Sequence, residues 1–299
     1  MSGISHFIEY LRVERRYSAY TVQAYEQDLR EFCSFLKCSP ETWDASVTTS
    51  DDVRQWLVVM LDNGLSARSV RRKLSSLRSY YKFLLRLGKT DKDITRSVIA
   101  PKMHKPLPVF FKESEMEQAE LQMEWGSDFT SLRDSLIIEM LYETGMRRAE
   151  LLRLTDADID FPQGHVRVFG KRNKERIIPF GERLSSMLRT YIASRNETFP
   201  EKSGTDYPVL LVGDKGAPLA PSALYRIVCA RMGEVSSLKK HSPHVLRHTF
   251  ATAMLNNGAD INTIKDLLGH ASLAATQVYT HTTFEQLRDE YRKAHPRAK

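Results

Sequence analysis

Six side chains in the second half of the chain together suit attack on a phosphodiester. They are two arginines, a lysine, two histidines and a tyrosine: Arg147, Arg247, Lys171, His244, His270 and Tyr279. Arginine stabilises charge on the non-bridging phosphate oxygens, because its planar fork offers paired hydrogen bonds and a permanent charge. Lysine or histidine can protonate a leaving sugar hydroxyl. Tyrosine, whose ordinary pKa is about 10, becomes a usable nucleophile beside cations that favour its phenolate.

Each of these residues also has an ordinary explanation when taken alone. An arginine after a Thr-Gly turn can pair with a nearby acid such as Glu150, and a lysine at a hairpin tip is commonly solvated. A histidine three positions before an arginine is often one of a surface pair, and Tyr279 can be a half-buried core aromatic. Only the combination indicates chemistry. The sequence shows no carboxylate cluster of the kind that holds paired Mg²⁺, which disfavours a two-metal nuclease.

The positive charge of the chain is concentrated near its N-terminus. Residues 1–106 hold 18 Lys+Arg against 12 Asp+Glu. Subtraction from the totals of 44 and 37 leaves 26 against 25 for the remaining 193 residues, so six of the seven net charges lie in the first third. This asymmetry favours a polyanionic partner for that third, although solvated basic faces are also common.

Length and composition predict a two-domain protein of the cytoplasm. A chain of 299 residues with 41% hydrophobic residues can bury two cores without metal or disulfide support. The three cysteines, Cys33, Cys38 and Cys229, have neither ligand spacing nor an even number, which favours reduced thiols. The first residues lack an export signal, and no apolar run approaches the roughly 18 residues of a membrane span. We therefore expect no membrane partner.

The first hundred residues predict a bundle of four helices. The fourth, Ser66 to Leu87, is amphipathic, and the stretch 65–88 contains no acid. An ordinary reading is a solvated basic face. The reading that we favour is a helix laid against DNA phosphates, where each cation displaces condensed counterions. The candidate DNA-binding residues are four arginines on this helix: Arg68, Arg71, Arg72 and Arg78.

A stiff linker and a second domain follow. Three prolines within residues 101–108 oppose both helix and hydrogen-bonded strand. Helical patterns at Leu132–Tyr142 and Ala149–Leu154 then give way to β alternation at Val166–Phe169 and at Ile177–Ile178, with the polar turn of a hairpin between them. We expect domains at 1–100 and 109–299, joined by the linker 101–108.

The order Arg, Lys, His-x-x-Arg, Gly-His, Tyr resembles the tyrosine recombinase (phage-integrase-like) family. TGMRRAELLRL is similar to the family's first arginine box, and SPHVLRHTFATAMLNNGADINTIKDLLGHASLAATQVYTH is similar to its second. The segment SARSVRRKLSSLRSYYKFLLR resembles the family's core-binding domain. Within the family the chain resembles the Xer chromosome-resolution group: the ending AHPRAK is similar to the XerC branch, and SPHVLRH is as close to XerD.

The resemblance implies a role for each of the six residues. Arg147 and Arg247 would bind the scissile phosphate, and Lys171 would protonate the leaving 5′ oxygen. His244 and His270 would assist proton transfer, and Tyr279 would attack. Arg147 rather than Arg148 follows from the pattern Thr-Gly-x-Arg-x-x-Glu, since Arg148 would point about 100° away on a helix. Arg172 replaces a glycine that is frequent in the family's hairpin, so the turn that carries Lys171 is expected to differ.

The resemblance also implies the fold, the partners and the use of the reaction. The fold would be mainly α, with a four-helix SAM-like core-binding domain and an α+β catalytic domain that contains a small antiparallel sheet. The protein would cut and rejoin duplex DNA at a specific site without metal or other cofactor. It would act as a homo- or hetero-tetramer, with a paralogous recombinase in the second case, and resolve chromosome dimers. The alternatives are a mobile-element integrase and a DNA-binding protein that does not cut.

The last sixteen residues, 284–299, carry a narrow apolar stripe of Phe284, Leu287 and Tyr291 on a charged helix. Such a stripe needs a surface to cover it. Packing on the same domain is the commoner outcome from sequence alone, whereas the resemblance implies docking on a neighbouring protomer. On the second reading, truncation after Thr283 would spare folding and impair cooperative assembly.

Overall fold

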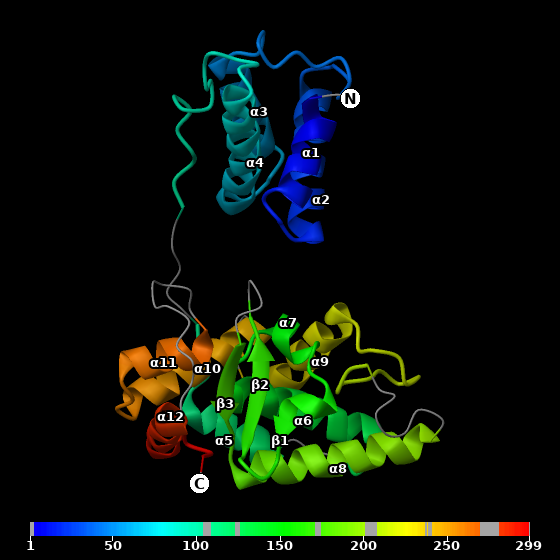
Figure 1. Ribbon diagram of the computed structural model, residues 1–299, viewed down its shortest axis with the longest axis vertical. Helices are drawn as coiled ribbons and strands as arrows, with labels where there is room; N and C mark the ends of the chain where they lie inside the picture. Colours follow the sequence, from blue (N-terminus) through cyan, green and yellow to red (C-terminus); the bar gives the residue numbers. More distant parts are fainter. Residues whose placement is uncertain are drawn as a thin grey trace. The chain divides into compact units, whose positions relative to one another are not determined.

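The computed structural model describes residues 3–103, 109–122, 126–170, 175–200, 208–236, 238, 241–269 and 281–298. Its contacts divide the chain into two compact units, Met1–Pro106 and Leu107–Lys299 (Figure 1). Each unit has its own hydrophobic core. The mainly α architecture predicted from the sequence is confirmed for the described residues.

Four helices make up the described part of the N-terminal unit: α1 (Gly3–Val13), α2 (Ala19–Phe35), α3 (Ser50–Asp62) and α4 (Ala67–Arg86). The chain starts three of them with local capping. Ser18 and Ser66 accept hydrogen bonds from backbone N–H groups in the first turns of α2 and α4, and Thr49 forms a capping box with Asp52 at α3. Helices α1, α2 and α3 all contact α4, which lies centrally in the bundle.

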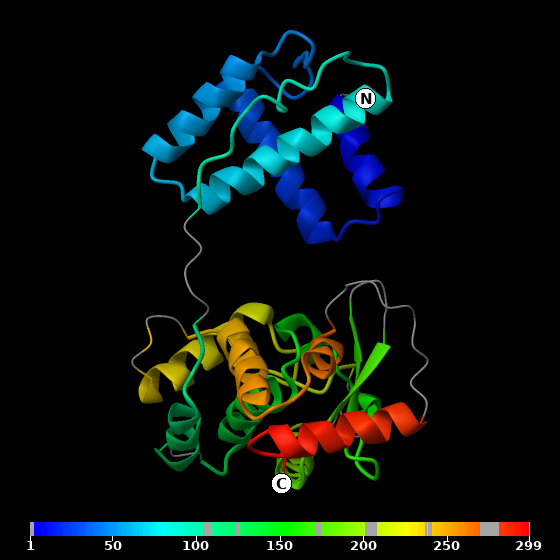
Figure 2. The ribbon, with the colours of Figure 1, turned by 90° about the vertical axis from the view of Figure 1, so that its left-hand side faces the viewer.

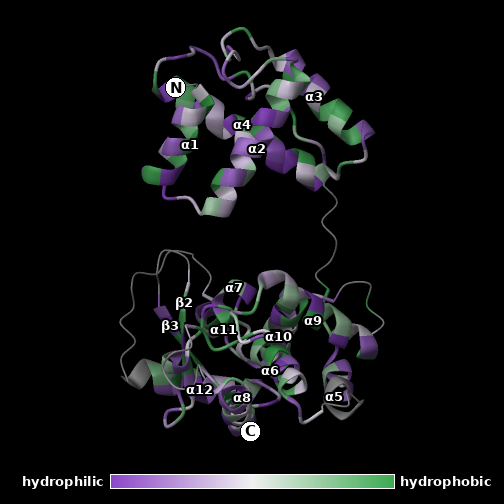
Figure 3. Cartoon of the chain, turned by 90° about the vertical axis from the view of Figure 1, so that its right-hand side faces the viewer, coloured by the Kyte–Doolittle hydropathy of each residue, from purple (hydrophilic) through white to green (hydrophobic). Residues whose placement is uncertain are grey.

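Helix α4 has the amphipathic character that its sequence predicts, and Figure 3 colours the helices of both units by hydropathy. Val70, Leu74, Leu77 and Tyr81 are fully buried. Leu85, by contrast, is exposed although it is apolar. It lies one position after Leu84 and so points past the edge of the buried face, since successive helix residues are about 100° apart.

The C-terminal unit is built around α6 (Phe129–Thr144). Leu136, Ile137, Met140 and Leu141 on this helix are all completely buried. A helix that is buried on every side needs no polar face. Helix α6 has no polar face because α8 (Glu182–Thr198), α9 (Pro221–Val235) and α10 (Pro243–Asn256) all pack against it.

Shorter elements complete this unit. They are α5 (Glu113–Gln122), α7 (Arg148–Leu151), the 3₁₀ turn η1 (Asp156–Asp158), α11 (Ile261–Leu268) and α12 (His281–Ala294). The helix predicted at Ala149–Leu154 is shorter than expected, because the chain leaves the helical conformation after Leu152 and hydrogen-bonds through Leu154 to Leu210. No helix in the described ranges is long and apolar enough to cross a lipid bilayer.

The predicted hairpin is confirmed as two antiparallel strands, β2 (His165–Phe169) and β3 (Glu175–Pro179), and a short strand β1 (Ile159–Asp160) extends the sheet in the order β1-β2-β3. Val166 pairs with Ile178, and Val168 pairs with Arg176. These four side chains are all buried, so one face of the hairpin joins the core and carries an arginine into it.

The C-terminal helix α12 packs on its own unit, against β3 and α10 (Figure 2). Phe284, Leu287 and Tyr291 are all buried, and the Tyr291 hydroxyl donates a 3.0 Å hydrogen bond to the Glu143 carboxylate. The stripe is therefore covered within its own unit, which is the first of the two readings of the sequence. This packing argues against the expectation that truncation after Thr283 would spare folding, because the truncation would remove a fully buried tyrosine from the core.

Candidate active site

The first predicted arginine follows a sharp helix end. Helix α6 stops at Gly145, whose backbone is left-handed with φ of 59°. Glycine is needed here twice over, because a Cβ at this position would lie 2.4 Å from the ring of Phe250. The turn leaves Arg147 extended as the residue before α7, not on the helix itself. The separation of about 100° expected for two residues of one helix therefore does not apply to Arg147 and Arg148, and both residues line the same hollow.

Arg147 is held by one acid and one carbonyl. Its backbone N–H and its guanidinium both donate to the Glu150 carboxylate, at 2.7 and 2.8 Å, and its Nη2 donates to the carbonyl of Gly269 at 3.1 Å. Its side chain remains 42% exposed. The pairing with Glu150 that the sequence offered as an ordinary explanation is thus real, and it leaves the guanidinium open to the hollow.

Arg247 lies on α10 and is almost fully buried. Its guanidinium donates to the carbonyl of Gly145 at 2.6 Å and to that of Leu268 at 2.7 Å. Burial, together with the charges of Arg147 and Arg176, lowers the pKa of Arg247 to about 10. It therefore stays charged at neutral pH, in surroundings with more cations than acids.

A third arginine, Arg176 on β3, was not predicted as a site residue. It is 5% exposed and binds both carboxylate oxygens of Glu150, at 3.1 and 2.8 Å. Burial alone would raise the pKa of Glu150, but the hydrogen bonds and charges of Arg176 and Arg147 outweigh it and hold that pKa at about 2. The sequence did contain a signal for this buried arginine. Arg176 lies two positions before the apolar Ile178 in the predicted strand, so both side chains point to the same, buried face.

The end of α11 is a common acceptor for all three arginines. The carbonyls of Leu267, Leu268 and Gly269 accept hydrogen bonds from Arg176, Arg247 and Arg147 in that order. These carbonyls lie at the C-terminal, negative end of the helix dipole, which favours cations. The structure therefore brings together Arg147 and Arg247, which are 100 positions apart in the sequence.

The two predicted arginines and one predicted histidine line one hollow of about 260 Å³. Its other lining residues are Met146, Arg148 of α7, Tyr225 of α9, and Ser242 and Pro243 at the start of α10. His244 is exposed and lies edge-to-face with His248, their ring centroids 4.5 Å apart. Lys171, His270 and Tyr279 lie outside the described residues, although β2, β3 and Gly269 lead to the segments that contain them.

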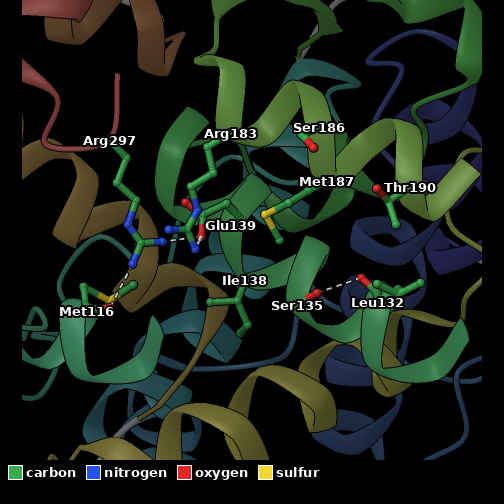
Figure 4. A pocket seen from close by; sticks show the side chains of 10 residues that line it. All are labelled: Met116, Leu132, Ser135, Ile138, Glu139, Arg183, Ser186, Met187, Thr190 and Arg297. Carbon is green, nitrogen blue, oxygen red and sulfur yellow. Dashed lines mark hydrogen bonds and ion pairs between the residues drawn. The ribbon is translucent and has the colours of Figure 1, made fainter. Parts of the chain in front are cut away.

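A larger hollow of about 400 Å³ contains none of the predicted site residues. It lies among α5, α6 and α8, and Figure 4 shows Arg183 and Arg297 both pointing towards the buried Glu139. Arg297 pairs with Glu139 and donates to the carbonyl of Met116 at 2.8 Å. Through these contacts Arg297 ties the segment after α12 to α6 and α5. Both arginines of this hollow lie against Glu139, and the hollow contains no tyrosine or histidine among its described lining residues.

The predicted DNA-binding arginines on α4 are in different surroundings. Arg72 forms a bidentate pair with Asp28 of α2, and Arg71 and Arg78 donate to the carbonyls of Pro101 and Val98. Arg68, in the first turn, is exposed. The neighbouring Lys73 pairs with both Asp28 and Glu31. The acids missing from 65–88 are therefore supplied by α2.

Comparison with known proteins assigns both units. The model of the phage integrase family matches residues 110–286, and that of the phage integrase N-terminal SAM-like domain matches residues 4–88. The chain is 41% identical over 298 residues to the tyrosine recombinase XerC of Oceanobacillus iheyensis, covering 99% of this chain and 96% of that protein. This relative confirms the resemblance to the XerC type.

Solved structures share the fold. An integrase of the Tn1549 transposon, in complex with a circular intermediate DNA, is 20% identical with a TM-score of 0.71, over 97% of this chain and 98% of that chain. A lambda integrase tetramer bound to a Holliday junction is 18% identical with a TM-score of 0.66, over 97% and 77%. From the two family matches and the full-length relative, the chain belongs to the phage integrase family of tyrosine recombinases.

Proposed function

We propose that this recombinase cuts and rejoins duplex DNA at a specific site through a covalent bond to Tyr279. The observation that carries the proposal is the charge balance of the hollow. Among the described residues, Arg147 and Arg176 both pair with the Glu150 carboxylate, while Arg247 donates to two carbonyls and adds a third positive charge. Three cations thus face one acid in this part of the structure, which leaves two positive charges unmatched, and the guanidiniums of Arg147 and Arg247 border the hollow. A phosphate diester supplies the missing negative charge and matches the arginine fork.

The proposed roles follow the chemistry of transesterification. Arg147 and Arg247 would hold the non-bridging oxygens of the scissile phosphate, where they would stabilise the added charge of the transition state. The Tyr279 oxygen would bond to phosphorus as the bond to the 5′ oxygen breaks. Lys171 would give its proton to that oxygen, and His244 and His270 would assist proton transfer. The 3′-phosphotyrosyl bond retains the energy of the phosphodiester. Rejoining is therefore the reverse step, in which a 5′ oxygen bonds to phosphorus as the bond to the Tyr279 oxygen breaks.

The DNA partner and the tetrameric assembly are proposed by analogy with solved structures of the same fold. The Tn1549 and lambda integrases named above are bound to DNA, and the lambda protein is a tetramer on a Holliday junction. We propose that the present chain likewise binds duplex DNA as a tetramer, built either from its own copies or together with a paralogous recombinase. Residues 1–100, including Arg68, Arg71, Arg72 and Arg78, would contribute phosphate contacts, and residues 109–299 would contain the catalytic centre.

The proposed use is resolution of chromosome dimers in the cytoplasm, in line with the XerC type. A mobile-element integrase would use the same six residues, and the fold shared with the Tn1549 integrase is compatible with either. Mapping the bound sites across the genome separates the two. One site in each chromosome supports dimer resolution, whereas sites at the ends of a mobile element support integration.

A nicked suicide substrate tests the central step, because loss of the short leaving strand traps the covalent adduct. We expect the wild-type protein to form the adduct and Tyr279→Phe to bind DNA but form none. Tyr225, which lines the hollow, is the competing nucleophile on geometry. Tyr225→Phe should still form an adduct that maps to Tyr279 by peptide mass. An adduct that persists in Tyr279→Phe would overturn the assignment, and a wild-type protein that binds without cutting would support the non-cutting alternative.

A further inference from the structure

Arg176 is a buried arginine near the hollow, and all three of its side-chain nitrogens donate hydrogen bonds. Burying an arginine is costly unless an acid balances its charge and acceptors bind its N–H groups. An arginine with all these partners has a structural role if the partners lie away from the site, and a positioning role if the partners themselves belong to the site.

One partner, Glu150, is shared with Arg147. The Glu150 Oε1 atom accepts from Arg176 at 3.1 Å and from Arg147 at 2.8 Å, while Oε2 accepts from Arg176 at 2.8 Å and from the backbone N–H of Arg147 at 2.7 Å. The bidentate grip of Arg176 fixes the plane of the carboxylate. The same carboxylate then fixes both the backbone and the guanidinium of Arg147.

The other partner is the end of α11. Arg176 Nε donates to the carbonyl of Leu267 at 2.7 Å, next to the carbonyls that accept from Arg247 and Arg147. Gly269 makes room for this contact: a Cβ there would lie 3.1 Å from Nη1 of Arg176. The residue that follows Gly269 in the chain is His270.

Resting on the proposed function, we propose that Arg176 is a positioning residue for the phosphate-binding pair. Through Glu150 it aligns Arg147, and through Leu267 it holds the helix end on which Arg147 and Arg247 both rest. Lysine cannot replace it, because an ammonium group is a single point charge and cannot form the bidentate grip together with the third bond. Arg176 itself need not touch DNA.

The test compares Arg176→Lys with a matched variant elsewhere in the same unit. Arg195 is also fully buried, also grips a carboxylate with two nitrogens, that of Asp156, and also donates to a carbonyl, that of Leu210. Asp156 and Leu210 are not in the hollow, so Arg195→Lys controls for the cost of losing a buried arginine. Both variants are measured for thermal unfolding, for DNA affinity and for single-turnover cleavage of the nicked substrate at saturating protein.

We expect Arg176→Lys to lower the cleavage rate about 100-fold, the effect of misplacing a catalytic group by about 1 Å, with DNA affinity unchanged. Arg195→Lys should lower the melting temperature to a similar extent and cleave at the wild-type rate. Equal cleavage rates for the two variants would overturn the proposal, as would a loss in Arg176→Lys that appears as weaker DNA binding alone. A wild-type protein that forms no adduct would instead count against the proposed function.

A second pair of variants keeps the test decisive if Arg176→Lys does not fold. Gly269 and Gly258 both follow helices in the left-handed conformation, with φ of 62° and 85°. A methyl group at Gly269 meets Arg176, whereas one at Gly258 meets nothing within 4 Å. Both substitutions strain the backbone, but only Gly269→Ala should slow cleavage at unchanged DNA affinity. Equal cleavage rates for the two would overturn the proposal.

Discussion

Two clusters of cations in this protein differ in how their charge is balanced. On α4, Arg72 and Lys73 face Asp28 and Glu31 of α2, so two cations meet two acids. In the described part of the C-terminal unit, Arg147, Arg176 and Arg247 lie around one acid, Glu150, which pairs with the first two. Asp28 is also bonded by the Ser76 hydroxyl at 2.6 Å, and at 1% exposure it is as buried as a core leucine.

The density of cations along a sequence therefore does not measure how many of them are available to an anion. The α4 segment has the most conspicuous run of basic residues in the chain, yet part of that run holds two helices together. The arginines of the hollow are scattered in sequence, yet they leave an uncompensated positive charge. An anion-binding site is defined by the positive charge that remains after the cations have paired with acids of the same protein.

The largest expected effect comes from removing an uncompensated cation. Arg247→Gln should lower single-turnover cleavage by about 10²–10³-fold, because it removes donors to the transition-state charge. The free energy of unfolding should fall by no more than about 1 kcal/mol, since the amide still donates to a carbonyl and repulsion from two arginines is relieved. The measurements are adduct formation and urea unfolding. A loss of several kcal/mol would contradict the charge imbalance that we infer.

Removing the buried acid of the balanced cluster should have the opposite pattern. Asp28→Asn leaves Arg72 and Lys73 with one acid less, and we expect the free energy of unfolding to fall by about 3 kcal/mol. Asp51→Asn is the control, because Asp51 pairs with Arg54 on the surface of α3 and should cost at most about 1 kcal/mol. The released cations should also steepen the salt dependence of DNA binding. Similar unfolding midpoints for the two variants would show that Asp28 is not the anchor of α4.

A third cluster, in which the two buried acids Glu139 and Glu143 lie close together, predicts a pH dependence. Burial, and then the charge of Glu139, raises the pKa of Glu143 from an ordinary 4.5 to about 8. The folded protein therefore binds this proton more tightly than the unfolded chain, and the resulting stability is lost as pH rises towards 8. Between pH 6.5 and 8 the free energy of unfolding should fall by about 1–2 kcal/mol.

Glu143→Gln should remove that slope, because the amide does not titrate and still offers an oxygen to the Tyr291 hydroxyl and to the Gly181 N–H. His295 does not interfere in this window. Burial lowers its pKa to about 3, so its contribution is lost only as pH falls below its ordinary value of 6.5. Chemical denaturation at several pH values provides the measurement. The assignment fails if the variant keeps the wild-type slope.

The smallest expected effect separates two arginines of α4. Arg68→Ala should flatten the log–log salt dependence of DNA binding by up to about one unit, as for one lost phosphate contact. Arg72→Ala should flatten it less, because much of the Arg72 charge is already matched by Asp28. Filter binding or fluorescence anisotropy at several salt concentrations measures both slopes. Equal slopes for the two variants would mean that Asp28 does not withhold Arg72 from DNA.

Features that depend on local pattern were predicted from the sequence. The spacing of apolar residues along Ser66–Leu87 predicted α4 almost to the residue, and alternation predicted the pairing of β2 with β3. Both features follow from the fixed periods of helix and strand, which any stretch of the chain displays by itself. The residue types that suit phosphodiester attack could likewise be recognised without a structure, because their chemistry belongs to the side chains.

The partners of those side chains could not be predicted, because they come from distant parts of the chain. Asp28 and Arg72 are 44 positions apart, and Glu150 and Arg176 are 26 apart. Tyr291 meets Glu143 from 148 positions away, which is why the covering of the tail stripe stayed open in the sequence. Periodicity shows which face of a helix or strand is buried, but not which other face lies against it. The sequence alone determined which groups the protein has, and only the tertiary packing decided which charges cancel and which remain free to bind an anion.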